Sequence, residues 1–170
     1  MKTLIIHPKD KSTDFLNIIH KNYTVFDVEK NSKSKLREAI KKHDKIIMLG
    51  HGSPDGLFSS KQERFIIDSN LVYLLREKLL VGIWCYASEF AIKYKLKGLF
   101  SGMIISEMDE AYLNAVDATE EEIEKSNFMF ANTIMSIEDF HSKQSVLFAK
   151  QMYDNKTSIV NFNREHIYYI

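Results

Sequence analysis

The 170-residue chain has little cysteine, proline or glycine: one cysteine, two prolines and six glycines. A single cysteine cannot form an internal disulfide, which fits a reducing interior and predicts a cytoplasmic protein. The 23 basic and 23 acidic side chains cancel, so net charge predicts neither a nucleic-acid nor a membrane partner. No apolar run approaches the length of a membrane span, and the short run before His7 is too small for a signal peptide.

Internal repeats, linkers and low-complexity segments are also lacking. A chain of this length fits one domain with a sizeable core. We therefore expect residues 1–170 to form a single α/β domain. The composition says nothing about its oligomeric state.

Short apolar runs alternate with segments of helical periodicity. The predicted strands are residues 3–6, 23–28, 46–49, 80–84 and 103–106, and the helices between them are about 12–21, 34–43, 71–79 and 88–97. This alternation predicts right-handed βαβ units and a mostly parallel sheet. With crossovers of the usual hand, the first four strands take the order 2-1-3-4.

Three further segments carry local signals. Residues 57–59 and 64–67 are expected to pair as a small hairpin beyond the sheet. Thr119 followed by Glu122 is a capping box that starts a long helix over 118–137, and residues 141–154 are predicted to form the last helix. Residues 157–160 and 167–170 have the composition of strands and are expected to add a hairpin or edge strands.

Two apolar runs end on residues that can do chemistry. His51 follows the run in KIIMLGHGSPDGLFSS (45–60), and Cys85 follows the run in LVGIWCYASEFA (80–91). Adjacent parallel strands bring the residues at their carboxyl ends into one crevice, where open α/β sheets bind ligands. An imidazole beside a thiol there forms a nucleophilic dyad, in which the base takes the thiol proton and the thiolate attacks a carbonyl.

The surroundings of both residues favour this chemistry. Gly50 and Gly52 flank His51 and would let the backbone approach a ligand closely. A helix is predicted to start just after Cys85, so its unpaired N–H groups and an imidazolium neighbour would lower the pKa of the thiol. The backbone amides of Gly52 and Cys85 are candidates for an oxyanion hole.

The motifs IIMLGHGSPDGL and GIWCYAS, followed by GLFSGMIISEMDEA, resemble the caspase-like (clan CD) cysteine peptidases, closest in pattern to bacterial caspase-like and CHAT domains. The resemblance implies a three-layer caspase-like (caspase-hemoglobinase) sandwich, with a mostly parallel central sheet of five or six strands flanked by helices. It also implies a hydrolase that cleaves a peptide or protein substrate, with His51 as base, Cys85 as nucleophile and no cofactor.

The chain departs from the family around the cysteine. Trp84 precedes Cys85, and Ile83 stands two residues before it, where caspases have a glutamine and metacaspases an aspartate. Neither an acidic nor a basic preference at P1, the substrate residue before the cleaved bond, therefore carries over. The chain is also shorter than most active members. A catalytically inactive caspase-like domain that binds or regulates a protein is the alternative.

The substrate pocket is expected beside Cys85, at the strand ends. The candidates to line it are His7, Lys9, Ile83, Glu107 and Asp109. A basic pocket at His7 and Lys9 would favour an acidic P1 residue, whereas Glu107 or Asp109 turned inward would favour a basic one. Ile83 favours a shallow, apolar floor.

Parts of the sequence are similar to three other kinds of site. His-Gly-Ser after an apolar strand is similar to sirohydrochlorin-type chelatases, but there it follows the first strand. A metal site from His7, His51 and Cys85 lacks a close-spaced ligand pair, so we expect no metal. A flavodoxin-like nucleotide binder needs a loop rich in glycine or hydroxyl residues after the first strand, and HPKDKST supplies Ser12 and Thr13 without a glycine.

Overall fold

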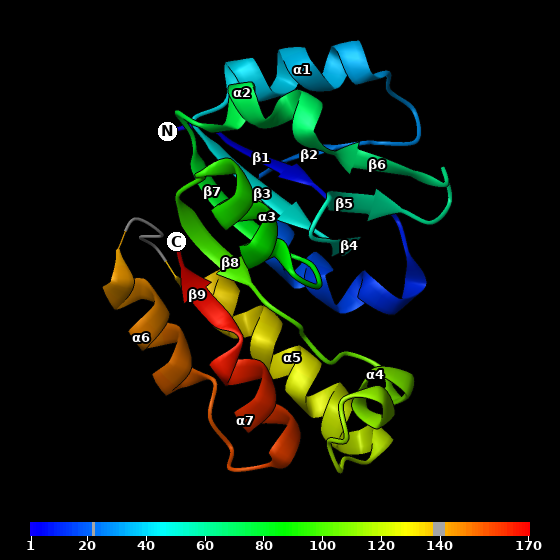
Figure 1. Ribbon diagram of the computed structural model, residues 1–170, viewed down its shortest axis with the longest axis vertical. Coiled ribbons are helices and arrows are strands. Elements are labelled where there is room, and N and C mark those ends of the chain that lie inside the picture. Colours follow the sequence, from blue (N-terminus) through cyan, green and yellow to red (C-terminus); the bar gives the residue numbers. More distant parts are fainter. Residues whose placement is uncertain (22, 138–141) are drawn as a thin grey trace.

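The computed structural model of the protein describes residues 1–21, 23–137 and 142–170. They form an α/β fold with a mostly parallel six-stranded sheet, a small antiparallel sheet and helices (Figure 1). In spatial order the large sheet consists of β2 (Thr24–Phe26), β1 (Thr3–Ile6), β3 (Lys45–Leu49), β7 (Leu79–Ile83), β8 (Gly98–Ser101) and β9 (Ile167–Tyr169). Only β9 runs antiparallel to its neighbour. The predicted order 2-1-3-4 is confirmed.

The central strands send their side chains alternately into two cores. Side chains that lie beside one another across the sheet share a core, because successive residues of a strand face opposite sides. One row is Ile5, Ile47, Val81 and Leu99, and the next is Leu4, Ile46 and Leu80. Both faces of the sheet are therefore buried, as continuous apolar strands predict.

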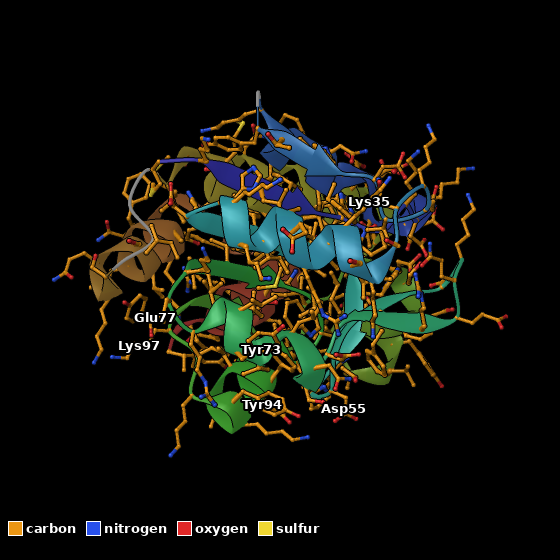
Figure 2. The ribbon with its side chains drawn as sticks, turned by 90° about the horizontal axis from the view of Figure 1, so that it is seen from above. Lys35, Asp55, Tyr73, Glu77, Tyr94 and Lys97 are labelled. Atoms are coloured by element: carbon orange, nitrogen blue, oxygen red, sulfur yellow. The ribbon has the colours of Figure 1, made fainter. Side chains whose placement is uncertain are left out.

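Helices cover each face (Figure 1). One core is closed by α1 (Lys33–Lys42), η2 (Ser69–Leu71), α2 (Val72–Leu75) and α3 (Ala87–Tyr94). The other is closed by η1 (Lys11–His20), α5 (Glu120–Ser136), α6 (Lys143–Met152) and α7 (Ser158–Glu165). Figure 2 shows the outer side of α1 and α2, where Lys35 and Tyr73 are exposed to solvent, as is Glu77 just after α2.

The helix predictions hold with changed lengths. Thr119 and Glu122 form the predicted capping box of α5, with a Glu122 N–H to Thr119 Oγ1 bond of 3.2 Å. The helix expected over 12–21 is the 3-10 helix η1, and the one expected over 71–79 is only η2 and α2. The helix expected from 141 is α6; its predicted first residue, His141, lies outside the described residues.

The small sheet contains β4 (His51–Ser53), β5 (Gly56–Ser59) and β6 (Arg64–Ile67). The hairpin predicted between 57–59 and 64–67 is confirmed as β5 and β6. The sequence did not predict β4, which turns back on β5 through Pro54 and Asp55. Gly56 has φ +141°, a conformation in the region that favours glycine.

The prediction of a strand over 103–106 is wrong; the strand is β8, residues 98–101. Residues 104–106 run beyond the sheet because the Asn163 side chain satisfies the backbone there. Its Oδ1 accepts from the Ile105 N–H at 2.7 Å, and its Nδ2 donates to the Ile105 carbonyl at 2.8 Å. Asn163 Nδ2 also lies 3.2 Å from the Tyr153 hydroxyl, which in turn bonds Ser126 at 2.6 Å.

At the C-terminus one of the two expected strands is present. Residues 167–169 form the edge strand β9. The expectation for 157–160 is wrong, because Thr157 caps α7 and its hydroxyl accepts from the Val160 N–H. A capped first turn outweighs the weak strand preference of the β-branched residues that follow.

Within the described ranges, no helix is both long and apolar enough to cross a membrane.

The Asn163 network yields a stability prediction. Asn163→Leu leaves the Ile105 N–H and carbonyl buried without partners, and we expect the free energy of unfolding to fall by about 2–4 kcal/mol. Urea denaturation measures it. Asn161→Leu, at an exposed position of the same helix, is the matched control and should change stability little. Equal losses in both variants would contradict the role of Asn163.

Candidate active site

The strand register brings the two candidate residues to neighbouring positions. Leu49, the last residue of β3, lies opposite Ile83, the last residue of β7. Gly50 follows with φ +136° and donates its N–H to the Ile83 carbonyl at 3.0 Å, so that the chain leaves the large sheet and enters β4. His51 begins β4, and Cys85 follows Trp84 after β7.

His51 and Cys85 line one narrow crevice of about 20 Å³. Its other walls come from the η1 region, the strand ends and the segment around α4 (Met108–Leu113). These residues are Thr13, Phe15, Leu16, Gly50, Ile83, Trp84, Ile104, Ser106 and Glu110. His51 and Cys85 therefore border one space of about the size of a water molecule at this end of the sheet. A direct contact between the imidazole and the thiol stays a prediction.

The His51 ring is held from the loop after β1. Its Nε2 lies 2.7 Å from Ser12 Oγ and 3.8 Å from Asp10 Oδ1. Ser12 Oγ lies 2.9 Å from the same Asp10 oxygen, which also accepts the Ser12 N–H at 3.1 Å. Burial alone would raise the pKa of Asp10, but these hydrogen bonds outweigh it and lower the pKa, so the carboxylate is ionised.

The sequence does not indicate Asp10 or Ser12 as partners of His51. Both lie in HPKDKST, the segment that also contains the pocket candidates His7 and Lys9. The predicted order 2-1-3 was the available signal, because it puts the loop after β1 beside the loop after β3.

Cys85 faces a different set of groups. Its Sγ lies 3.8 Å from the Ile104 carbonyl oxygen and 3.9 Å from Glu110 Oε1. Burial, and then the Glu110 carboxylate, raise the pKa of the Cys85 thiol to about 11. In the part of the chain that the structure describes, no hydrogen bond joins Cys85 to His51.

The predicted lowering of the Cys85 pKa is therefore wrong for this structure. The helix α3 follows Cys85, and its N-cap residue Tyr86 has left-handed backbone angles (φ 66°). The Cys85 sulfur forms its hydrogen bonds with Ile104 and Glu110 instead of with this helix start. The sequence did not indicate that Glu110 lies beside the thiol. Its Oε2 accepts from the Ser106 N–H at 2.7 Å and the Glu107 N–H at 3.2 Å as part of the α4 capping box, which leaves Oε1 beside the thiol.

The glycine proposed for the oxyanion hole has a packing role. A Cβ at Gly52 would overlap Trp84 Cδ1 and the Gly56 carbonyl oxygen. The Trp84 indole lies against β4 and donates from Nε1 to the Ser53 carbonyl at 3.0 Å. The oxyanion hole of Gly52 and Cys85 amides stays a prediction.

The five candidates for the substrate pocket lie in different places. Ile83 lines the crevice with Cys85. His7 and Lys9 line a separate pocket of about 530 Å³ between the loops after β1 and β2. Glu107 and Asp109 are exposed at the start of α4. The structure thus brings only Ile83 beside the thiol.

His7 is a buried, neutral residue. Its Nδ1 lies 2.9 Å from His20 Nε2, and its Nε2 lies 3.1 Å from Thr13 Oγ1. Burial, and then the neighbouring His20, lower the pKa of His7 to about 4. Lys9 forms an ion pair with Glu29 at 3.8 Å. His7 therefore adds no positive charge at neutral pH to the basic pocket that the sequence suggested.

The three metal-ligand candidates do not converge. His7 contacts His20 and Thr13, His51 contacts Ser12, and Cys85 contacts Glu110. Among residues 1–21, 23–137 and 142–170, no group of three or more His, Cys, Asp or Glu side chains is arranged to hold a metal ion.

Comparisons with protein-family models, with curated proteins and with solved structures found no match to this chain. The caspase-like resemblance of its motifs therefore stays a prediction.

Glu110→Gln tests the control of the thiol by its neighbour. Removing the negative charge should lower the pKa of Cys85 from about 11, although burial keeps it raised. At a fixed pH below the midpoint, we expect iodoacetamide to alkylate Cys85 about tenfold faster. Asp109→Asn, an exposed carboxylate on the same helix, is the control. An unchanged pH profile in Glu110→Gln would show that burial alone sets the pKa.

His7 yields a prediction about pH and stability. Its pKa is about 4 in the folded protein and about 6.5 in an unfolded chain, so the unfolded state binds more protons between these values. Stability is therefore full above pH 6.5 and falls as the pH drops toward 4, by up to about 3 kcal/mol from His7. His7→Gln removes the titrating group. Its unfolding free energy, measured by urea between pH 7 and pH 4, should fall less steeply than that of the wild type; equal slopes would contradict the prediction.

Proposed function

We propose that this protein is a cysteine peptidase of the caspase-like superfamily, with His51 as base and Cys85 as nucleophile. The observation that carries the proposal is that His51 and Cys85 follow the adjacent parallel strands β3 and β7 and line one crevice. This position, at the carboxyl ends of strands, is where open α/β sheets bind their ligands.

The architecture supports the same proposal. Five parallel strands in the order β2-β1-β3-β7-β8, an antiparallel edge strand and helices over both faces fit the three-layer caspase-hemoglobinase sandwich that the motifs imply. His51 and Cys85 follow the third and fourth parallel strands along the chain, β3 and β7, as the apolar runs before them predict. A cytoplasmic location is part of the proposal and rests on the single cysteine.

The proposed reaction runs in two steps. The Cys85 thiol gives its proton to the His51 imidazole while the sulfur attacks the carbonyl carbon of the scissile bond, and the negative carbonyl oxygen accepts hydrogen bonds from the Gly52 and Cys85 amides. The C–N bond then breaks as the imidazolium protonates the leaving amine. Water, deprotonated by His51, hydrolyses the thioester and releases the acid, and the thiol regains its proton.

The thiol must be activated before it can react. With a pKa of about 11, only about one Cys85 in ten thousand is ionised at pH 7. In this proposal, peptide binding moves Glu110 away from the sulfur and so removes the second cause of the raised pKa, after burial. Ile83 in the crevice wall favours a small or apolar P1 residue.

A second candidate function is a catalytically inactive caspase-like domain that binds or regulates another protein. The raised pKa of Cys85 and the small volume of the crevice, about 20 Å³, favour it. The two candidates share the fold and differ in whether Cys85 turns over a peptide.

A peptide library scanned at P1 separates them. If the protein is a peptidase, wild type cleaves a subset of peptides, with apolar P1 residues preferred, and Cys85→Ala and His51→Ala lose at least about a hundredfold in kcat/KM. Glu110→Gln is assayed beside them, so that a silent wild type with an active variant reveals a thiol restrained by Glu110. No turnover by either protein at any P1 residue contradicts the peptidase and leaves the binding domain.

A further inference from the structure

We infer that Asp10 and Ser12 are positioning residues for His51, which they hold through a relay from the imidazole Nε2–H to the Ser12 hydroxyl and from that hydroxyl to the Asp10 carboxylate. The relay fixes the neutral ring with its proton on Nε2 and leaves Nδ1 as the basic nitrogen. Its catalytic meaning rests on the proposed peptidase function.

The direction of the relay follows from counting protons. Ser12 Oγ carries one proton and lies within hydrogen-bond distance of two groups, His51 Nε2 at 2.7 Å and Asp10 Oδ1 at 2.9 Å. A carboxylate can only accept. If the Ser12 hydroxyl donated to His51, its oxygen lone pairs would face the ionised carboxylate at 2.9 Å. The hydroxyl therefore donates to Asp10, and the imidazole donates from Nε2 to the hydroxyl.

The carboxylate at the end of the relay is fixed in place. Asp10 is the N-cap residue of η1, and its Oδ1 accepts the Ser12 backbone N–H. The loop that carries Asp10 and Ser12 follows β1, whose partner β3 leads into His51. Since the chain leaves β1 toward β2 on one side and returns to β3 on the other, this loop lies at the topological switch point of the sheet.

The same geometry argues against Ser12 as a nucleophile. A serine nucleophile needs a base nitrogen that accepts its proton, whereas here Nε2 donates. An ionised Asp10 at 2.9 Å from Oγ would also oppose the negative charge that builds up when a carbonyl is attacked. In the described part of the chain, both side-chain contacts of the His51 ring nitrogens are made by Nε2. Nδ1 is the nitrogen left to take a proton from Cys85.

The experiment reads the proton position directly. The full-length protein is labelled with ¹⁵N in its histidine rings, and long-range ¹H–¹⁵N correlations assign the tautomer of neutral His51, identified by its loss in His51→Gln. We expect the proton on Nε2. In Ser12→Ala the exchange of this proton with water should accelerate about fivefold or more, as the loss of one hydrogen bond predicts, and Ser12→Thr should restore slow exchange. Ser32→Ala, which removes the capping hydroxyl of α1, is the matched control and should leave the signal unchanged.

The outcomes separate the relay from the proposed function. A wild-type His51 protonated on Nδ1, with Nε2 accepting from Ser12, overturns the relay whether or not the protein cleaves peptides. If the proton is on Nε2 and the wild type cleaves peptides, Ser12→Ala should lower kcat with little change in KM. Ser12→Thr should restore kcat. An unchanged kcat in Ser12→Ala overturns the positioning role. A proton on Nε2 without any turnover supports the relay and contradicts the peptidase.

Discussion

The structure depends on the parallel pairing of β1, β3 and β7 in a single register. All five residues of β3 are buried, and its side chains alternate between two cores that different helices close. A slip of one residue would exchange these side chains between cores of different shape, so the register is strongly fixed. The same register ends all three strands at one edge, where the loops with Asp10 and Ser12, His51 and Cys85 begin. The position of the candidate site therefore follows from the register of the strands.

Much of this sheet could be predicted, because buried apolar runs and helical periodicity are local features and the handedness rule supplies the order. Of the two strand predictions that failed, one is decided by a distant group and the other by a local helix cap. Residues 103–106 have the composition of a strand, but the backbone of Ile105 is satisfied by the side chain of Asn163, 58 residues further along the chain. Residues 157–160 are rich in β-branched side chains, yet Thr157 caps a helix there. The Asn163 contact is too distant in sequence for local propensity to predict, whereas the Thr157 cap is a local signal that outweighs the strand composition.

The candidate site divides in the same way. His51 and Cys85 could be found because each ends an apolar run. Asp10, Ser12 and Glu110 lie in loops or at a helix start, where no periodicity marks them, and their contacts depend on how η1 and α4 begin. The pKa of Cys85 was predicted in the wrong direction for this reason: a helix start was visible in the sequence, whereas the burial of the sulfur and its carboxylate neighbour were not.

Two carboxylates act in opposite ways on the two halves of the site. Asp10 lies 3.8 Å from His51 Nε2 and would stabilise an imidazolium, whereas Glu110 lies 3.9 Å from Cys85 Sγ and opposes a thiolate. At nearly equal distances, their Coulomb effects on a charge-separated pair are similar in size and opposite in sign. Burial adds to the effect of Glu110 on the sulfur and favours the neutral thiol. Displacement of Glu110 would leave the attraction of Asp10 unopposed, but the thiol would still have the raised pKa that its burial causes, because burial is the larger of the two effects.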